Sequence, residues 1–383
     1  MANYNTQKIL HVVSGLVTGG AEMMLVRLIE AKGDSCCHAV ISLRDEGVFG
    51  ERIRRAGVPL FCLNWHRPMA WYSQPAILKQ LRAFSPQFIF GWMYQGNLGA
   101  LLLARLLKNV PVIWSVHSSL HNIRDRSLAN RMILDLNRRL SGQPACIVFV
   151  STTSRTHHEE YGFRPRRVVT IPNGIDTGDF TFSQVARERV RSELCLSQNE
   201  ELIGSVGRYN PVKAYPIFLR AAALYRRTNP LARFCLVGRG LERTNSELMS
   251  LVRELGLEDV LLLPGEREDV RDFYSAFDLF TLSSESEAFP VVLLEAMACE
   301  RPCVVTDVGD CREILGEDGF TVSPGDHTAL CHGWATVTRK PDAQRRLIGG
   351  GLRSRVKEMY SFSRMMDRYG DLFSNIEELA GRP

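Results

Sequence analysis

Short apolar or β-branched runs alternate with amphipathic stretches along the whole chain, and this alternation limits the possible folds. Runs such as Ile9–Ser14 and Leu202–Val206 are typical of buried strands, whereas Ala21–Lys32 and Ile217–Arg226 have the apolar spacing of helices. Repeated strand–helix alternation indicates parallel sheets covered by helices on both faces. Because both halves show it, we predict an α/β fold with two Rossmann-like domains whose sheets face a cleft.

Length and composition exclude several other classes of protein. The 383 residues suffice for two or three domains, and 45% hydrophobic with 23% charged residues is ordinary for a soluble globular protein. No apolar run approaches the ~20 residues of a membrane-spanning helix, and the N-terminus lacks the pattern of a signal peptide. The ten cysteines form no CxxC pair, so we expect reduced thiols in a cytoplasmic protein.

A turn-rich segment near the middle of the chain marks the predicted domain boundary. Its sequence, IPNGIDTGDF over 171–180, contains Pro and Asn-Gly, which cannot continue a helix or a central strand. We predict one domain over 1–175 and a second over 176–361. Apolar residues at helical spacing predict a last helix over about 362–383 that packs back onto the first domain.

Charge is distributed unevenly between the two halves. Residues 1–180 carry 21 Lys and Arg against 12 Asp and Glu, whereas residues 181–383 carry 26 against 30. The basic first half suits an anionic partner such as phosphate groups or a membrane surface, although a solvated basic face explains it equally well. No nucleic-acid recognition motif accompanies the arginines, so we expect no nucleic-acid partner.

A glycine-rich turn follows the first predicted strand. Gly15, Gly19 and Gly20 lie between that strand and the next helix, where backbone N–H groups favour negative charge. The spacing is not GxGxxG, and glycines at such a turn also serve only to make it tight. The turn is therefore a candidate phosphate site with a simpler structural alternative.

Two cations follow the first strand of the second half. Arg208 and Lys213 would lie at the carboxyl end of a central strand, where a planar guanidinium and a compact ammonium can hold a diphosphate. The alternative is a pair of surface cations without a ligand. The position at the start of a βα unit favours the diphosphate interpretation.

The segment SESEAFPVVLLEAMAC over 284–299 carries the most information. Pro290 suits the first turn of a helix, and the helix that follows is apolar all round and should be buried. Glu295 would then be a buried carboxylate that needs a ligand or a partner. Together with Glu287 it could bind the hydroxyls of a nucleotide-sugar; the alternative is a core helix whose Glu pairs with an Arg.

These residues resemble the retaining glycosyltransferases of family GT4, which have the GT-B fold. The resemblance rests on the spacing Glu287-x7-Glu295, on the two upstream cations and on the Gly-Gly-Ala-Glu sequence near the start, and it covers nearly the whole chain. The segments 173–176 and 309–313 also match, but Asp310 replaces a family glycine. Ala288 and Pro290 stand where many members have glycine, and Ala288 could narrow the space near the donor sugar.

The resemblance implies a role for each candidate residue. Glu295 would bind the nucleotide ribose, Glu287 would contact hydroxyls of the donor sugar, and His117 resembles a first-domain histidine near that sugar. Arg208 and Lys213 would neutralise the leaving nucleoside diphosphate, which is electrostatic catalysis. The donor would also be cradled by the backbone of two segments, which are Gly19-Gly20 and Ala288-Phe289-Pro290-Val291. A lone histidine at a strand end is otherwise structural.

The resemblance implies a cytoplasmic hexosyltransferase that moves a sugar from a nucleotide-sugar, UDP-linked rather than GDP-linked, to a glycan or lipid-linked acceptor. The matching segments resemble enzymes of surface polysaccharide and lipopolysaccharide assembly. No DxD motif is present and the two cations replace a metal, so we expect no metal or other cofactor. A non-catalytic nucleotide-sugar-binding subunit and a GT-B epimerase are the alternatives.

An aromatic segment in the basic half adds a prediction about membranes. The stretch 64–72, NWHRPMAWY, carries two Trp and one Tyr, which favour a membrane interface. Together with the basic charge, it predicts shallow, reversible contact with the inner face of an anionic plasma membrane. The alternative is an acceptor-binding loop whose rings stack on sugars.

Overall fold

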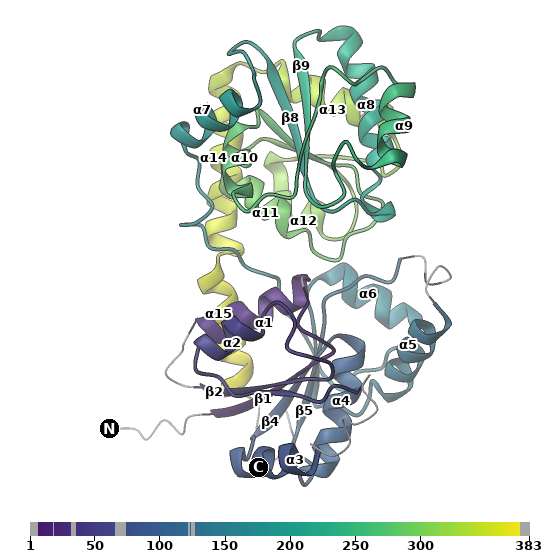
Figure 1. The fold of residues 1–383 in the computed structure, drawn as a ribbon, viewed down its shortest axis with the longest axis vertical. Helices are drawn as coiled ribbons and strands as arrows, with labels where there is room; N and C mark the ends of the chain where they lie inside the picture. The colour runs from purple at the N-terminus through teal and green to yellow at the C-terminus, as the bar shows by residue number, and fades with distance from the viewer. Residues whose placement is uncertain are drawn as a thin grey trace. The chain divides into compact units, whose positions relative to one another are not determined.

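The computed structural model describes residues 7–17, 19–31, 36–65, 74–121, 123 and 127–375 (Figure 1). The chain forms two compact units, Met1–Pro172 with Met366–Pro383, and Asn173–Met365. Each unit has its own parallel sheet, so the predicted pair of Rossmann-like domains is confirmed.

The N-terminal unit is built on a seven-stranded parallel sheet in the order β3-β2-β1-β4-β5-β6-β7. The order reverses between β1 and β4, so the loops that follow these two strands flank the switch point at which such sheets bind ligands. The strands are β1 (Gln7–Val13), β2 (Cys36–Ser42), β3 (Leu60–Cys62), β4 (Phe88–Trp92), β5 (Val112–Val116), β6 (Cys146–Phe149) and β7 (Val168–Thr170).

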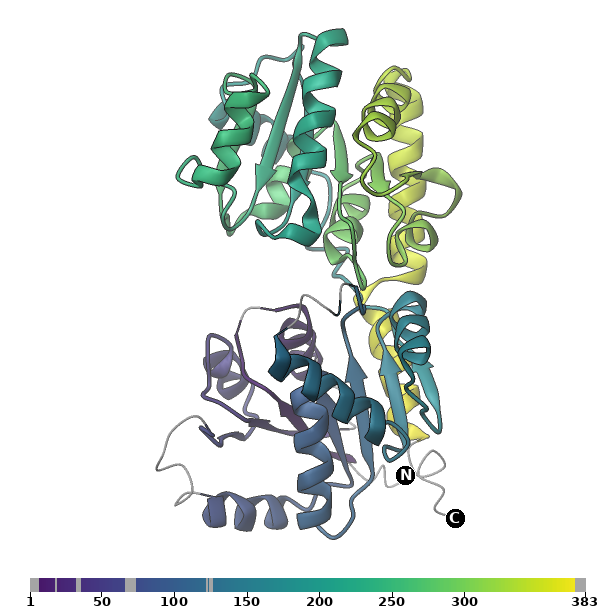
Figure 2. The same ribbon diagram turned by 90° about the vertical axis from the view of Figure 1, so that its right-hand side faces the viewer.

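Helices cover both faces of this sheet (Figure 2). They are α1 (Gly20–Glu30), α2 (Gly50–Arg55), α3 (Gln74–Phe84), α4 (Met93–Leu106), α5 (Leu128–Leu140) and α6 (Thr152–Tyr161), with α15 (Phe362–Ser374) from the end of the chain. Because side chains alternate along a strand, β4 shows both faces. Gly91 lies against Ala100 of α4, whereas the rings of Phe88 and Phe90 lie 5.3 and 6.1 Å from Phe373 of α15.

Helix α15 is tied to the first strand of the N-terminal unit. The Gln7 side-chain amide donates a hydrogen bond of 2.9 Å to the carbonyl of Phe373. Tyr369, Leu372 and Phe373 are buried, so this helix contributes to the core. The predicted last helix runs to 383, but residues 376–383 lie outside the described part of the chain.

The C-terminal unit contains a six-stranded parallel sheet in the order β10-β9-β8-β11-β12-β13. The order reverses between β8 and β11, so the loops after these strands are neighbours at the carboxyl edge of the sheet. The strands are β8 (Glu201–Val206), β9 (Ala232–Val237), β10 (Leu261–Gly265), β11 (Leu279–Leu282), β12 (Cys303–Thr306) and β13 (Phe320–Val322).

Two groups of helices cover this second sheet (Figure 1). One group is α8 (Tyr215–Thr228), α9 (Ser246–Glu254) and α13 (His327–Thr338), and the other is α7 (Gln184–Glu193), α10 (Val270–Ala276), α11 (Val291–Ala298) and α14 (Asp342–Met359). The short helices η3 (Pro211–Lys213), α12 (Cys311–Leu315) and η4 (Gly316–Asp318) lie in the loops. Trp334 of α13 is fully buried among the rings of Phe218, Tyr225 and Phe234.

Helix α4 differs from its predicted bounds, because the apolar spacing predicts a helix over Leu98–Leu107. It begins at Met93, directly after β4, and Met93 itself has a positive φ of 60°. The additional turn contains Gly96, where a Cβ atom would lie 2.4 Å from the carbonyl oxygen of Val12. Glycine is a weak helix former, but here it lets the helix lie directly on the sheet.

Two further features concern membrane spans and thiols. Among the described residues, no helix has the length and apolar character needed to cross a membrane. None of the ten cysteines, all of which lie among the described residues, forms a disulfide.

Candidate active site

The C-terminal unit brings two of the predicted residues into direct contact. Lys213 ends η3 in the loop after β8, and Glu287 lies in the loop after β11. The Lys213 ammonium donates a hydrogen bond of 2.6 Å to Oε1 of Glu287, and the two side chains are only 21% and 11% exposed. The Ser284 hydroxyl donates a second bond of 2.7 Å to the same oxygen.

The second oxygen of this carboxylate, Oε2, differs from Oε1 in its hydrogen bonding. Within the described part of the chain, Oε2 of Glu287 accepts no hydrogen bond. An ammonium has three N–H donors, and Lys213 uses one on Glu287. The pair therefore keeps both an acceptor and further donors for a ligand that carries hydroxyls and an anionic group.

Backbone contacts hold the two loops together. Glu285 N donates to the carbonyl of Val212 at 2.8 Å, and the Ser283 hydroxyl donates to the carbonyl of Lys213 at 2.9 Å. The Thr306 hydroxyl at the end of β12 donates to the carbonyl of Ser284 at 2.7 Å. No role was predicted for Ser283 and Ser284 from the sequence, although their position directly after β11 was a usable signal.

Gly309 fixes the backbone of Glu287 from the loop after β12. Its φ is +57°, and a Cβ atom there would lie 2.5 Å from the carbonyl oxygen of Glu287. Only glycine combines this left-handed conformation with so close an approach. The 309–313 match to the family therefore includes a residue in contact with the candidate site.

Four candidate residues lie at the start of α11. Ala288 is half-buried, Phe289 and Pro290 are buried, and Val291 is half-buried. Pro290 is the N-cap residue and not, as predicted, the first helical residue. Its carbonyl accepts the first hydrogen bond of the helix, from Leu293 N at 3.0 Å. The N–H groups of Val291 and Val292 come before Leu293 in the chain, in the first turn where N–H groups have no partner inside the helix.

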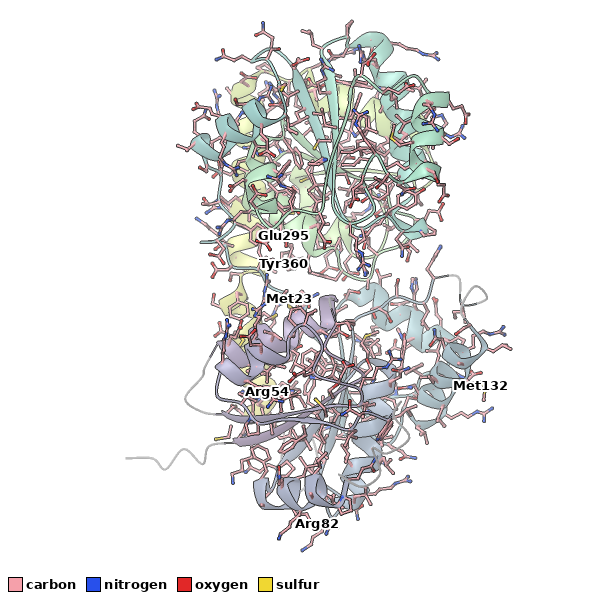
Figure 3. The ribbon with its side chains drawn as sticks, viewed as in Figure 1. Met23, Arg54, Arg82, Met132, Glu295 and Tyr360 are labelled. Carbon is pink, nitrogen blue, oxygen red and sulfur yellow. The ribbon has the colours of Figure 1, made fainter. Side chains whose placement is uncertain are left out.

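The structure corrects the predicted burial of the whole α11 helix and gives Glu295 a protein partner. The side of α11 that carries Val291, Val292 and Glu295 is half-buried, whereas the rest of the helix is buried. The Tyr274 hydroxyl donates a hydrogen bond of 2.7 Å to Oε2 of Glu295, so the carboxylate is neither fully buried nor without a partner. Figure 3 labels Glu295 on α11, near the same end of the unit as Tyr360.

Tyr274 is the partner that the sequence did not identify. It is fully buried in α10, and burial together with the charge of Glu295 raises the pKa of its hydroxyl well above the ordinary value. The tyrosine therefore stays a hydrogen-bond donor to the carboxylate at neutral pH.

Arg208 is not part of this cluster in the structure. It is exposed in the loop after β8, and its side chain makes no hydrogen bond or ion pair with the described residues. It lies five positions before Lys213, on the same carboxyl edge of the sheet. Its guanidinium is therefore available to an anion without breaking a protein contact.

The N-terminal unit holds the remaining candidates. Gly19 is the N-cap of α1, with an extended backbone at φ −161°, and Gly20 is the first helical residue. This conformation does not require glycine, and a Cβ atom at Gly20 would meet nothing within 4 Å. At Gly19 a Cβ atom would instead lie 2.3 Å from a carboxylate oxygen of Glu22, so only Gly20 leaves open space beside the start of the helix.

His117 follows β5 and is held on three sides. Its Nε2 lies 2.7 Å from the Ser115 hydroxyl, its backbone N–H points at the Met93 sulfur, and its ring stacks on Trp92 with 5.4 Å between centroids. Its Nδ1 is buried and has no hydrogen-bond partner among the described residues. Burial lowers the pKa of His117 to about 4, so the ring is neutral at pH 7.

Trp92 also contacts a pair of histidines, His11 and His38, that was not predicted from the sequence. Trp92 Nε1 can only donate, so the 3.1 Å contact makes Nδ1 of His11 the acceptor. His11 Nε2 then carries the proton of its 2.9 Å hydrogen bond to Nδ1 of His38. Burial lowers the pKa of both, that of His38 to about 4, so the pair is neutral at pH 7.

Two adjoining cavities open at the carboxyl edge of the N-terminal sheet. Their volumes are about 480 and 330 Å³, and Ser14, Gln95 and Ile133 line both. The larger is further lined by Arg44, Trp65 and leucine side chains, and the smaller by Tyr94, Ser118 and Asn130. Such a mixture of apolar walls and few polar groups is typical of small-molecule sites.

No cluster of three or more His, Cys, Asp or Glu side chains that could hold a metal ion occurs among the described residues.

Comparison with known proteins defines the class. Residues 18–179 match the family described as glycosyltransferase family 4, and residues 200–340 match glycosyl transferases group 1. HepE of Anabaena, solved in complex with UDP, superposes with a TM-score of 0.83 at 21% identity, over 96% of this chain and 100% of that one. Sucrose-phosphate synthase from Thermosynechococcus elongatus gives a TM-score of 0.77 at 19% identity, over 97% and 99%. The fold is thus the GT-B fold of glycosyltransferases.

Relatives by sequence agree with this class. The D-inositol 3-phosphate glycosyltransferase of Kineococcus radiotolerans is 30% identical over 69% of this chain and 65% of its own length. The N-acetyl-alpha-D-glucosaminyl L-malate synthase of Bacillus anthracis is 30% identical over 55% and 54%. The match to the first of these relatives thus spans slightly less than two thirds of its length. The chain belongs to glycosyltransferase family 4.

Proposed function

We propose that the protein is a retaining glycosyltransferase that moves a sugar from a nucleotide-sugar to an acceptor hydroxyl. The contact between Lys213 and Glu287 carries this proposal, because it places a cation and an open carboxylate oxygen together at the switch point of the sheet. A nucleotide-sugar needs both a cation for its diphosphate and an acceptor for its hydroxyls.

The proposed transfer breaks the bond between the anomeric carbon of the sugar and the diphosphate oxygen. Both electrons of that bond go to the leaving nucleoside diphosphate, and the acceptor oxygen forms the new bond while its proton passes to the departing diphosphate oxygen. Lys213 and Arg208 stabilise the charge that develops on the leaving group. Glu287 accepts from sugar hydroxyls through Oε2, and Glu295 accepts from the ribose.

We assign His117 a hydrogen bond with a hydroxyl of the donor sugar. A neutral ring with an unpartnered Nδ1, held by Trp92 and Ser115, can exchange a hydrogen bond with a sugar hydroxyl without first breaking a protein contact. The N–H groups of Gly19, Gly20, Val291 and Val292 would complete the cradle of the donor, beside Ala288, Phe289 and Pro290.

We propose a UDP-sugar as the donor, ahead of a GDP-sugar, and transfer without a metal ion. HepE, which shares the fold, was solved with UDP, so UDP-sugars come first in the test. A thermal-shift screen of UDP-, GDP- and ADP-sugars shows which nucleotide-sugar the protein binds, because a bound ligand raises stability with the logarithm of its excess over Kd. EDTA should leave the shift and the turnover unchanged; loss of both, restored by Mn²⁺, would contradict transfer without a metal.

The proposed acceptor is a glycan or a lipid-linked glycan in the assembly of surface polysaccharide, such as lipopolysaccharide. The larger cavity of the N-terminal unit supports this, because Trp65 and leucines give it apolar walls for a sugar face or a lipid chain. A small anionic acceptor is the second candidate, since relatives are named for inositol phosphate and malate and Arg44 lines that cavity.

A cytoplasmic location with peripheral contact to an anionic membrane completes the proposal. Of the aromatic segment 64–72, only Asn64 and Trp65 lie within the described residues. Helix α5 offers a second feature: Leu128, Met132 and Leu136, four residues apart, are 74%, 72% and 44% exposed (Met132 is labelled in Figure 3). Arg131 and Arg139 flank them, which suits an anionic lipid surface.

Two other functions remain distinguishable by assay. A GT-B epimerase would convert a UDP-sugar to its epimer without an acceptor, and a non-catalytic subunit would bind the donor without turnover. Release of UDP that depends on an added acceptor supports the transferase, whereas epimer formation or binding alone overturns it.

A further inference from the structure

A cavity of the C-terminal unit lies at the edge of the sheet opposite to the candidate active site. It has a volume of about 350 Å³, and its walls include Asp278 and Pro302, which directly precede β11 and β12. The candidate residues Lys213 and Glu287 instead follow the strands β8 and β11. Because the strands are parallel, the two sites lie at opposite ends of the sheet.

Arginines dominate the charge of this cavity. Four arginines and three carboxylates line it: Arg187, Arg301, Arg345 and Arg346 with Asp278, Glu300 and Asp342. Each carboxylate already has a guanidinium partner. These pairs are Asp278 with Arg187 at 2.6 Å and Arg191 at 3.2 Å, Glu300 with Arg353 at 3.7 Å, and Asp342 with Arg345.

Two of the lining arginines have no carboxylate partner. Within the described part of the chain, neither Arg301 nor Arg346 forms an ion pair. Arg346 is exposed at the start of α14, and its side chain makes no hydrogen bond with the described residues either. The cavity therefore has two guanidinium groups that no carboxylate of the described residues contacts in an ion pair.

Arg301 shows the imbalance most clearly. Its Nε donates to the carbonyl of Cys299 at 2.9 Å, its Nη1 donates to that of Phe277 at 2.8 Å, and its charge lies 4.7 Å from the ring centroid of Phe182. Burial, and then the charge of Arg187, lower its pKa to about 10. The charges of Asp278 and Glu300 act in the opposite direction, but neither carboxylate pairs directly with this half-buried guanidinium, so an anion in the cavity would supply a direct ionic partner.

We propose that this cavity binds a small anion that carries a phosphoryl group, held by Arg301 and Arg346. A phosphoryl dianion could pair with both guanidiniums, because its oxygens surround one phosphorus and can bind Arg346 of α14 and Arg301 before β12 at the same time. A volume of about 350 Å³ suits a metabolite and not a macromolecule.

Calorimetric titration tests the site with inorganic phosphate and, in a second arm, glucose 1-phosphate. The titrations use the full chain carrying Lys213→Ala, so that the proposed donor site does not contribute. Arg346→Ala should raise Kd about tenfold or more, as loss of a charge-assisted pair does. Arg301→Lys keeps the charge but loses the planar fork, and should raise Kd similarly. Arg253→Ala, an exposed arginine of α9 away from the cavity, should leave Kd unchanged.

The two arms identify the source of the phosphoryl group. Tighter binding of glucose 1-phosphate assigns the site to phosphorylated metabolites, and equal binding assigns it to free phosphate. Binding that is unchanged by both Arg346→Ala and Arg301→Lys overturns the proposal, as does binding seen only when Lys213 is intact. Because Arg346 is exposed, its variant remains informative even if Arg301→Lys weakens folding.

Discussion

Lys213 Nζ lies 2.6 Å from Oε1 of Glu287, although the two residues are 74 positions apart in the chain. Each comes from a loop that follows a neighbouring strand, and the Ser284 hydroxyl shares the same carboxylate oxygen. The ion pair fixes the positions of the ammonium and the carboxylate, and Oε2 of Glu287 remains without a hydrogen-bond donor among the described residues. A donor would meet a site that is already ordered, which lowers the entropic cost of binding.

Substitution of Lys213 or Arg208 tests whether these two cations stabilise the leaving nucleoside diphosphate. Lys213→Gln and Arg208→Ala should each lower kcat by on the order of 10²-fold, because each removes charge from the group that stabilises the departing diphosphate. Steady-state kinetics with the donor found in the thermal-shift screen measure this. Arg227→Ala, an exposed arginine of α8, is the control. Unchanged turnover in both variants would remove the diphosphate assignment.

Glu295 and Tyr274 form a pair for a double-mutant cycle. Glu295→Gln should weaken donor binding by about 1.5–3 kcal/mol, the range for a charge-assisted hydrogen bond. Tyr274→Phe should weaken it less, since the tyrosine only orients the carboxylate. Donor titration and urea unfolding of both variants and the double variant measure the coupling. Intact affinity with lost stability would make Glu295 purely structural.

Gly309 allows a matched test of contact with Glu287. Ala at position 309 or 325 must adopt a positive φ, which costs roughly 1–2 kcal/mol of stability. A Cβ atom at Gly325 meets nothing within 4 Å, whereas one at Gly309 meets the carbonyl of Glu287. Gly309→Ala should therefore also weaken donor binding, and Gly325→Ala should not. Equal donor affinity in the two variants would show that Glu287 does not depend on this contact.

From the pKa of His38, which pairs with the buried His11, we predict how stability depends on pH. The folded protein holds the pKa of His38 at about 4, below its ordinary value of 6.5, so the unfolded chain binds more protons between these pH values. Stability should fall as the pH drops through this window. His38→Asn keeps an acceptor for His11 but cannot titrate, so urea unfolding at pH 7 and pH 5 should show a smaller loss than in the wild type. An equal loss would assign the pH dependence to other groups.

Liposome flotation tests the proposed membrane contact of α5. Binding should require anionic lipid and weaken as salt rises, because surface charges are screened. Leu128→Ser with Met132→Ser should weaken it further, since both side chains are more than 70% exposed. Leu347→Ser on α14, 76% exposed, is the control for loss of an exposed leucine. Protein that stays unbound with anionic liposomes at low salt contradicts membrane contact.

Much of the fold could be predicted because local patterns carry it. Apolar runs such as Val112–Val116 are buried strands, and the helix over Gln74–Phe84 has an apolar stripe that the spacing shows. Helices α6 and α14 were not predicted, since α6 reads TTSRTHHEEY and α14 carries three consecutive glycines. Their stability depends on packing and capping more than on an apolar pattern.

The sequence by itself determined the residue types and their order: parallel α/β domains, cations after one strand, and two glutamates eight positions apart. Only the tertiary structure decided their partners. Lys213 meets Glu287, Tyr274 meets Glu295, and two arginines of α14 line one cavity with Arg301, because strands and helices distant in sequence are neighbours in the fold. Local spacing encodes periodicity, whereas a hydrogen bond or an ion pair depends on angles and distances that the packing of whole elements sets.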